Sequence, residues 1–174
     1  MDALPAAERI ADLGSGAGFP GLPLAVALPG AHVDLIESAA RKCEVIIRLA
    51  DAADAENAHA IHARAEEWAE GEGAEAYGAV TARALAALPV ILEYAAPLLR
   101  AGGALVAWKG ARDADEERAA GHAAGELGLS AEEVRQVTPF EGARHRHLHI
   151  YRKSAPTPPR YPRRPGMAEK RPLG

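Results

Sequence analysis

The chain has 174 residues, of which 48% are hydrophobic and 25% are charged, so it is long enough for one domain with a substantial core. Its single cysteine, Cys43, excludes an internal disulfide and suits a reducing compartment. No uninterrupted apolar run approaches the length of a membrane span, and no basic-apolar signal peptide precedes Ile10. We therefore expect a cytoplasmic protein that does not contact a membrane.

Charge is distributed unevenly along the chain. The formal net charge is −4, but residues 152–174 carry seven basic residues and one acid, a net +6 that leaves −10 on residues 1–151. A basic tail on an acidic body suggests a polyanionic partner. A disordered tail that only increases solubility would have the same composition, so both interpretations stay open.

The first two thirds of the sequence alternates between strand and helix patterns, which is typical of a parallel α/β sheet. The expected strands span residues 9–13, 32–36, 57–63, 77–82 and 104–108. Two helices are expected over residues 22–28 and from Ser38, as the N-cap, to about Ala53. A third amphipathic helix is indicated by apolar residues that step by three or four, namely Leu85, Leu88, Leu92, Ala96 and Leu99.

The last third predicts a surface helix over residues 113–127, stopped by Gly128, and then an antiparallel hairpin of residues 133–138 and 146–152. After Ser154 the chain is rich in proline, which disfavours both helix and central strand. We therefore expect one domain over residues 1–154 and a tail over residues 155–174, which either wraps the domain or reaches a partner.

A glycine-rich turn follows the first predicted strand. Asp12 is followed by Gly14, Gly16 and Gly18, and Phe19 replaces the last glycine of the dinucleotide pattern G-x-G-x-x-G. Glycines in such a turn adopt positive φ and let a ligand approach the backbone. The G-x-G-x-G spacing with an acid two residues before it resembles the first motif of S-adenosylmethionine-dependent methyltransferases.

Charged residues stand at the ends of the later strands, where doubly wound sheets bind ligands. The Glu37 carboxylate is suited to accept hydrogen bonds from both ribose hydroxyls of an adenosine ligand. The alternative is that it only stabilises the N-terminus of the following helix through the helix dipole. Glu66 either lies in a loop that covers the edge of an adenine ring or is a solvated acid on the surface. Arg83 and Lys109 suit a ligand carboxylate or an RNA phosphate, the alternative being surface ion pairs.

Three alternating histidines, His145, His147 and His149, would share one face of a strand. This spacing resembles a metal-ligand set, but acids or cysteines at short spacing are missing. We favour ordinary strand-surface histidines and expect no metal.

Five segments and the tail together resemble the small-subunit ribosomal RNA methyltransferase G family, also called glucose-inhibited division protein B. In order they are DLGSGAGFPG (12–21), LIESAARK (35–42), ARAEE (63–67), TARA (81–84), WKG (108–110) and PTPPRYPRRPGMAEKRPL (156–173). The resemblance covers essentially the whole chain. Family members carry a helical segment of some tens of residues before the first strand, and we expect that segment to be missing here.

The resemblance implies a doubly wound, mostly parallel sheet with a C-terminal antiparallel hairpin, the class I methyltransferase fold. It also implies methyl transfer from S-adenosylmethionine to N7 of a guanine in 16S ribosomal RNA, free or within the small ribosomal subunit. The cofactor contacts carried over from the family are Gly14, Phe19, Ala65, Glu66 and Arg83. The turn pattern adds Gly16 and Gly18, and the general methyltransferase pattern adds Glu37.

Guanine N7 carries no proton at neutral pH, so we expect a positioning mechanism without a protein general base. The residues expected to contact RNA are Arg83, Lys109, Arg146, Arg160, Tyr161, Arg163 and Arg164. Two rival functions stay open: a non-catalytic RNA-binding or ribosome-associated module and, with less support, an NAD-dependent dehydrogenase. We expect a monomer.

Overall fold

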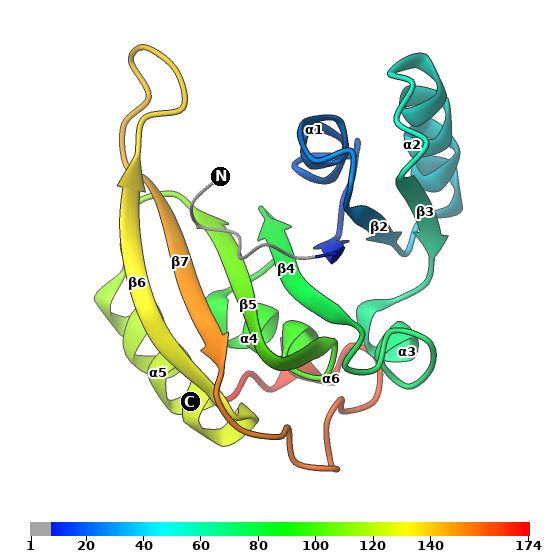
Figure 1. Cartoon of the computed structure of the whole chain (residues 1–174). Helices are drawn as coiled ribbons and strands as arrows, with labels where there is room; N and C mark the ends of the chain where they lie inside the picture. The colour runs from blue at the N-terminus through cyan, green and yellow to red at the C-terminus, as the bar shows by residue number, and fades with distance from the viewer. Residues whose placement is uncertain (1–7) are drawn as a thin grey trace.

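The structure, a computed structural model, describes residues 8–174 and contains a seven-stranded mixed sheet of strand order β3-β2-β1-β4-β5-β7-β6 (Figure 1). Strands β1 to β5 are parallel, and β7 is antiparallel to both β5 and β6. The strands are β1 Arg9–Leu13, β2 His32–Glu37, β3 Ala58–His62, β4 Tyr77–Arg83, β5 Leu99–Lys109, β6 Leu129–Val137 and β7 Arg146–Lys153. The expected α/β fold with a C-terminal hairpin is confirmed.

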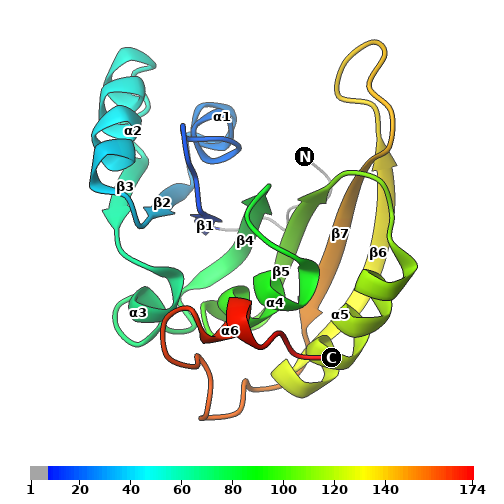
Figure 2. The same cartoon turned by 180° about the vertical axis from the view of Figure 1, so that it is seen from behind.

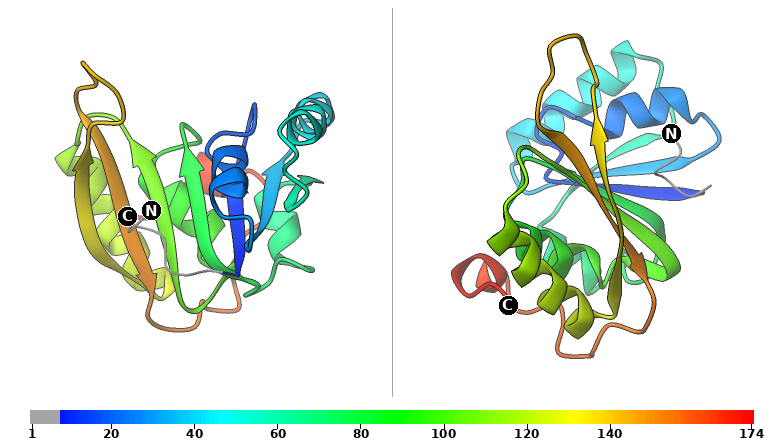
Figure 3. Two further views of the ribbon diagram at one scale, coloured as in Figure 1. Left: turned by 45° about the horizontal axis from the view of Figure 1, so that its top comes forward. Right: turned by 90° about the vertical axis from the view of Figure 1, so that its left-hand side faces the viewer.

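Helices cover both faces of the sheet (Figure 3). One face carries α1 (Gly21–Ala27) and α2 (Ala40–Ala52), and the other carries α4 (Leu88–Ala95), α5 (Ala114–Leu127) and the short α6 (Met167–Lys170), with α3 (Ala65–Ala69) beside α4. Each layer has its own apolar core. Ile46 of α2 and Leu22 of α1 pack on one face, while Leu92 and Leu127 pack on the other. Burying both faces of the parallel strands explains their apolar sequences.

The carboxyl ends of β1 to β5 meet at one edge of the sheet. The pairs Leu13 with Ile36 and Arg83 with Trp108 fix the register there. The antiparallel pairing of Lys109 with His147 brings the start of β7 to the same edge. The hairpin loop between β6 and β7 therefore projects beside the ends of the parallel strands (Figure 1).

Two expected helix boundaries are wrong. Ser38 is not a helix N-cap, because α2 begins after Ala39, whose amide donates to the Glu37 carboxylate at 3.0 Å. Leu85 precedes α4 and Leu99 lies in β5, since the helix ends at Ala95 and, after a turn over residues 96–98, the chain pairs with β4 from Leu99 onward. The three- and four-residue spacing of these apolar residues therefore extends beyond both ends of α4.

The three histidines also differ from the expected surface stripe. His149 is buried with 2% of its surface exposed, the imidazole of His147 lies 2.8 Å from the Gly110 carbonyl oxygen, and His145 precedes the strand. Burial lowers the pKa of His149. Within residues 8–174 no group of three or more metal-binding side chains is found, and no helix is long and apolar enough to span a membrane.

The proline-rich tail wraps the domain, which selects one of the two possibilities that its composition left open. It leaves β7, passes beneath α4 and α5, and ends near the same helices (Figure 2). A Cβ on Gly128, at the end of α5, would lie 2.4 Å from the Ala155 carbonyl oxygen, so this left-handed C-cap glycine also makes room for the tail. Met167–Lys170 is helical, contrary to the expectation that prolines would exclude helix, because this segment lies between Pro165 and Pro172.

Candidate active site

The glycine turn at the end of β1 combines three residues with positive φ: 61° at Gly14, 60° at Gly16 and 88° at Gly18. A Cβ on Gly14 would lie 2.6 Å from Leu85, and one on Gly18 would lie 2.4 Å from Leu22. A Cβ on Gly16 would meet only the Gly14 carbonyl, at 3.9 Å. Packing therefore requires the outer two glycines, whereas Gly16 leaves open space above the turn where a ligand can approach the backbone.

Glu37 ties the glycine turn to the next strand. Its side chain is buried, its Oε2 accepts from the Gly16 amide at 3.0 Å, and its Oε1 accepts from the Ala39 amide at 3.0 Å. Lys42 lies 3.6 Å from the same carboxylate. Each carboxylate oxygen has a further lone pair, so the structural role of Glu37 leaves acceptor capacity for a ligand hydroxyl.

A cavity of about 190 Å³ opens between the glycine turn and the start of α3. We call it the cofactor cavity; its walls are Gly14, Ile36, Ser38, Ala63, Arg64, Ala65, Glu66, Leu85, Tyr94 and Glu169. Glu66 is buried with 4% of its surface exposed, so the solvated-acid alternative is wrong. Its Oε1 accepts from the Gly166 amide at 2.8 Å, and its Oε2 lies 3.6 Å from Arg64 Nε.

Asp12 lies beneath the glycine turn and is completely buried. Its Oδ2 accepts from the Gly21 amide at 3.0 Å, whereas its Oδ1 has no hydrogen-bond partner within residues 8–174. Burial raises the pKa of Asp12 to about 7, against the opposing effects of its hydrogen bonds and of Arg83. The carboxyl group therefore changes its protonation state near neutral pH.

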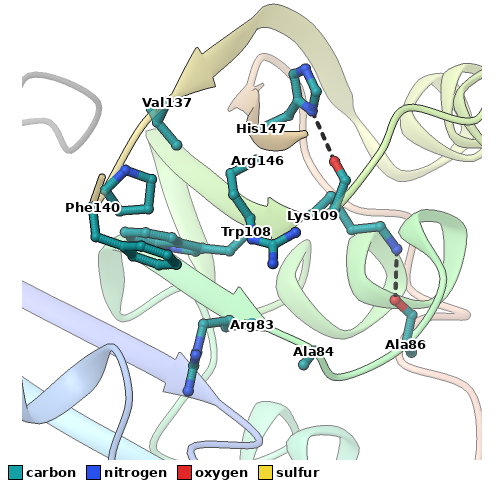
Figure 4. A pocket seen from close by; sticks show the side chains of 11 residues that line it. Arg83, Ala84, Ala86, Trp108, Lys109, Val137, Phe140, Arg146 and His147 are labelled. Carbon is teal, nitrogen blue, oxygen red and sulfur yellow. Dashed lines mark hydrogen bonds between the residues drawn. The ribbon is translucent and has the colours of Figure 1, made fainter. Parts of the chain in front are cut away.

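A second cavity, of about 430 Å³, lies over the ends of β4 and β5 (Figure 4). We call it the acceptor cavity; it is lined by Arg83, Ala84, Ala86, Trp108, Lys109, Gly110, Val137, Pro139, Phe140, Arg146 and His147. Residues 83–86 separate the two cavities, because Leu85 lines the first and its neighbours line the second. The positive φ of Ala84, 53°, belongs to this dividing segment.

Aromatic and basic side chains face one another across the acceptor cavity. Phe140 and Trp108 lie on one wall, and Arg146 reaches toward the middle, while Arg83 extends out on the opposite side (Figure 4). The Trp108 indole donates to Thr81 at 2.9 Å, which fixes its ring. Phe140 has 63% of its surface exposed. Within the described chain, neither arginine has an ion-pair partner.

Arg83 also contacts the glycine turn. Its Nε lies 3.4 Å from the Phe19 carbonyl oxygen, and its guanidinium lies 5.8 Å from the centre of the Phe19 ring. Phe19 has 49% of its surface exposed. These two residues, separated by 64 positions, therefore lie side by side next to the acceptor cavity, which Arg83 lines.

Lys109 has an internal role that the sequence did not indicate. Its ammonium donates to Glu116 at 2.7 Å and to the Ala86 carbonyl oxygen at 3.2 Å. Glu116 also accepts from the Leu88 amide at the start of α4. The structure therefore shows the ion-pair alternative for Lys109, whose charge is paired beside the cavity, and its contact with RNA stays a prediction.

The tail residues expected to contact RNA are mostly paired internally as well. Arg160 and Tyr161 both donate to Glu126, and Arg163 forms a bidentate pair with Glu93 at 2.7 and 2.5 Å. Of the four, only Arg164 lacks a side-chain partner within residues 8–174. The tail thus pairs with acids on α4 and α5, as expected of a tail that wraps the domain, and its contact with RNA stays a prediction.

Of the residues that the sequence predicted for the cofactor, Gly14, Ala65 and Glu66 line the cofactor cavity and Arg83 lines the acceptor cavity. Neither lining includes Gly16, Gly18, Phe19 or Glu37. The lining residues that sequence reasoning missed include Tyr94 and Glu169 in the cofactor cavity, and Pro139 and Phe140 in the acceptor cavity. Phe140 had one usable signal, since it is an aromatic residue in the loop of a predicted hairpin. Glu169 had none, because its position depends on how the tail folds.

The strand order, the glycine turn after β1 and the acid after β2 define a class I S-adenosylmethionine-dependent methyltransferase. Solved structures of this class superpose on the chain. A predicted O-methyltransferase from Agrobacterium tumefaciens gives a TM-score of 0.68 at 26% identity, covering 88% of this chain and 78% of that one. A 16S rRNA (adenine(1408)-N(1))-methyltransferase from Catenulisporales acidiphilia gives 0.69 at 16% identity, covering 87% and 86%, which shows the shared fold.

The chain belongs to the rRNA small subunit methyltransferase G family, whose model matches residues 1–148. Two relatives bear that name. The protein from Desulfitobacterium hafniense is 38% identical, with 95% of this chain and 70% of that protein covered. The protein from Rubrobacter xylanophilus is 43% identical, with 99% of this chain and 68% of that protein covered. The family resemblance found in the sequence is confirmed.

Proposed function

We propose that this protein binds S-adenosylmethionine in the cofactor cavity and transfers its methyl group to N7 of a guanine in 16S ribosomal RNA. One observation carries the proposal: in a chain of this family, a cavity beside the glycine turn and an aromatic, basic cavity adjoin each other across residues 83–86. The first suits the adenosine of the cofactor and the second suits an RNA base. We expect the protein to act as a cytoplasmic monomer.

The residues of the first cavity fit the cofactor. The open space over Gly16 admits a ligand to the backbone, Glu37 supplies carboxylate oxygens for ribose hydroxyls, and Glu66 lines the cavity where we place the adenine edge. Phe19 and Arg83 lie at the boundary with the acceptor cavity, where we place the methionine end of the cofactor. Arg83 is suited to pair with its carboxylate.

The second cavity fits an RNA nucleotide. Trp108 and Phe140 present flat surfaces on which a base can stack, and the unpaired Arg146 is suited to hold a phosphate. A guanine inside a duplex cannot reach this recess, so the target base must be unstacked. The family name and this chemistry together favour ribosomal RNA over a small-molecule acceptor.

No protein base is needed for this transfer. Guanine N7 has an exposed lone pair and the cofactor's sulfonium methyl is already activated, so the chain has to align the two and exclude water. Among the side chains that line the acceptor cavity, His147 is the only imidazole, and its Nδ1 lies 2.8 Å from the Gly110 carbonyl oxygen.

The single-turnover rate on bound RNA is therefore expected to be nearly flat from about pH 6 to 8, a range that lies between protonation of N7 and ionisation of N1. The rate should be measured by rapid mixing of saturating enzyme with RNA and labelled S-adenosylmethionine. His147→Gln is the matched variant and should leave the profile flat. A log-rate slope of one that disappears in His147→Gln would instead identify a general base.

Replacing Glu37 with alanine is expected to weaken S-adenosylhomocysteine binding by about 10- to 150-fold. The variant removes a charged acceptor whose hydrogen bonds are worth about 1.5–3 kcal/mol. Isothermal calorimetry measures this change. Glu37→Gln keeps one acceptor oxygen for the Gly16 amide and should bind with intermediate affinity, while Glu44→Ala, an exposed acid on α2, should match the wild type. Wild-type affinity in Glu37→Ala would remove this residue from the site.

A further inference from the structure

The C-terminal tail forms part of the cofactor cavity. Glu169, from α6, lines that cavity together with Glu66 and Tyr94, although it is 155 positions from Gly14, which lines the same cavity. Figure 2 shows α6 beside α3 and α4, on the face of the sheet away from α1 and α2. A segment that composition suggests to be a free arm therefore completes a wall of the ligand site.

Several contacts fix the position of this wall. The Arg163 guanidinium pairs with Glu93, which is 2% exposed, and also donates to the Arg171 carbonyl oxygen at 2.8 Å. Ala168 is buried with 1% exposure against the core of α4. The Gly166 amide donates to Glu66, which belongs to the cavity itself. The backbone on both sides of Glu169 is thus held by the domain.

The two acids of this wall differ in their free acceptor capacity. Glu66 has one oxygen on the Gly166 amide and the other facing Arg64. Glu169 accepts only a long hydrogen bond, 3.4 Å, from the Tyr94 hydroxyl, within residues 8–174. Burial together with Glu66 and Glu169 raises the pKa of Tyr94 to about 12, so this phenol stays protonated and remains a donor. Glu169 is therefore the carboxylate with lone pairs available to a ligand.

The location of Glu169 indicates which part of the ligand it meets. The Glu37 carboxylate holds the glycine turn, where we place the ribose. Glu169 and Glu66 come from α6 and α3 beside Tyr94 of α4 and line the same cavity, but within residues 8–174 no hydrogen bond joins either carboxylate to the turn. Beyond the ribose, the adenosine group that donates hydrogen bonds is the exocyclic amine of adenine. A carboxylate acceptor there favours adenine over a purine with a carbonyl group at the same position.

We propose that Glu169 is a cofactor-binding residue, accepting a hydrogen bond from the adenine amine, and that the folded tail thereby sets the specificity of the site for an adenine nucleoside. This inference rests on the proposed function only in taking S-adenosylmethionine as the ligand. It assigns the tail to the cofactor, not to RNA, and so explains why its arginines are paired with acids of the domain.

The test compares two ligands by calorimetry: S-adenosylhomocysteine and S-inosylhomocysteine, which carries a carbonyl oxygen in place of the amine. The wild type is expected to prefer the adenine ligand at least tenfold. Glu169→Gln should bind S-adenosylhomocysteine about tenfold more weakly and should lose most of this preference, since a glutamine amide can also donate to the carbonyl oxygen. Lys170→Gln, the adjacent exposed residue of α6, should behave as the wild type.

The outcomes separate the two proposals. If the wild type binds neither ligand, the proposed function fails. If the wild type binds and Glu169→Gln keeps both its affinity and its preference, the role of Glu169 is wrong while the function stands. A loss of affinity for both ligands by the same factor, with the preference intact, would show that Glu169 only supports the wall and would also overturn its proposed contact.

Discussion

Replacing Arg163 with alanine is expected to lower the free energy of unfolding by about 3–5 kcal/mol, the cost of leaving one member of a buried ion pair without its partner. The stranded group is Glu93, whose side chain is 2% exposed inside the layer formed by α4 and α5. Two hydrogen bonds, at 2.7 and 2.5 Å, are lost together with the one to Arg171. Urea denaturation followed by circular dichroism measures the change.

A neighbouring arginine provides the matched control. Arg164 is exposed and has no side-chain partner within residues 8–174, so Arg164→Ala should change stability by less than about 0.5 kcal/mol. The double variant Arg163→Met with Glu93→Met should recover most of the loss, because it no longer buries an uncompensated charge. A loss below about 1 kcal/mol in Arg163→Ala would show that this ion pair does not anchor the tail.

The stability of the wild type is expected to fall, relative to Asp12→Asn, by up to about 4 kcal/mol as the pH rises from about 4 to 8. Burial raises the pKa of Asp12 from 3.8 to about 7 in the folded chain, and one pKa unit corresponds to about 1.4 kcal/mol. The folded state therefore holds a proton that the unfolded state releases near pH 4. The stabilisation from this bound proton is complete below the pKa of Asp12 in the unfolded chain and is lost as the pH rises through its pKa in the folded chain.

Asparagine at position 12 keeps an oxygen for the Gly21 amide but carries no proton to lose. Denaturation of both proteins at pH 5, 6, 7 and 8 gives the difference directly. Asp51→Asn, on the exposed side of α2, controls for the general effect of removing a surface acid. Parallel pH profiles for the wild type and Asp12→Asn would mean that Asp12 is ionised in the folded protein throughout this range.

Most of the sheet was predictable because the central parallel strands β1, β2 and β4 are buried on both faces and are therefore apolar. Residues 9–13 were predicted with their observed bounds, and the second strand differed by one residue, Glu37. The error around α4 has a physical cause. Leu85 and Leu99 are apolar because they line the cofactor cavity and the core, not because they belong to the helix between them. Periodicity reports burial and does not show where a helix ends.

The parts of the candidate site that local sequence determines were predictable, whereas the parts that depend on tertiary contacts were not. The glycine turn and Glu37 follow directly from β1 and β2, and the structure joins them by a hydrogen bond from Gly16. The sequence does not show that Lys109 pairs with Glu116 and Arg163 with Glu93, because a basic side chain looks the same in sequence whether it faces solvent or an acid of the domain. Glu169 could not be found at all, since it reaches the cofactor cavity only after the tail has packed on α4.

Direct identification of the methylated atom tests the central claim. The purified chain should be incubated with S-adenosylmethionine labelled in the methyl group and with small ribosomal subunits or 16S RNA that lack this modification. Mass spectrometry of the digested RNA is expected to show one labelled 7-methylguanosine per RNA molecule. Label on another base or atom, or no label in a protein that binds S-adenosylhomocysteine, would contradict the assignment of guanine N7 as the acceptor.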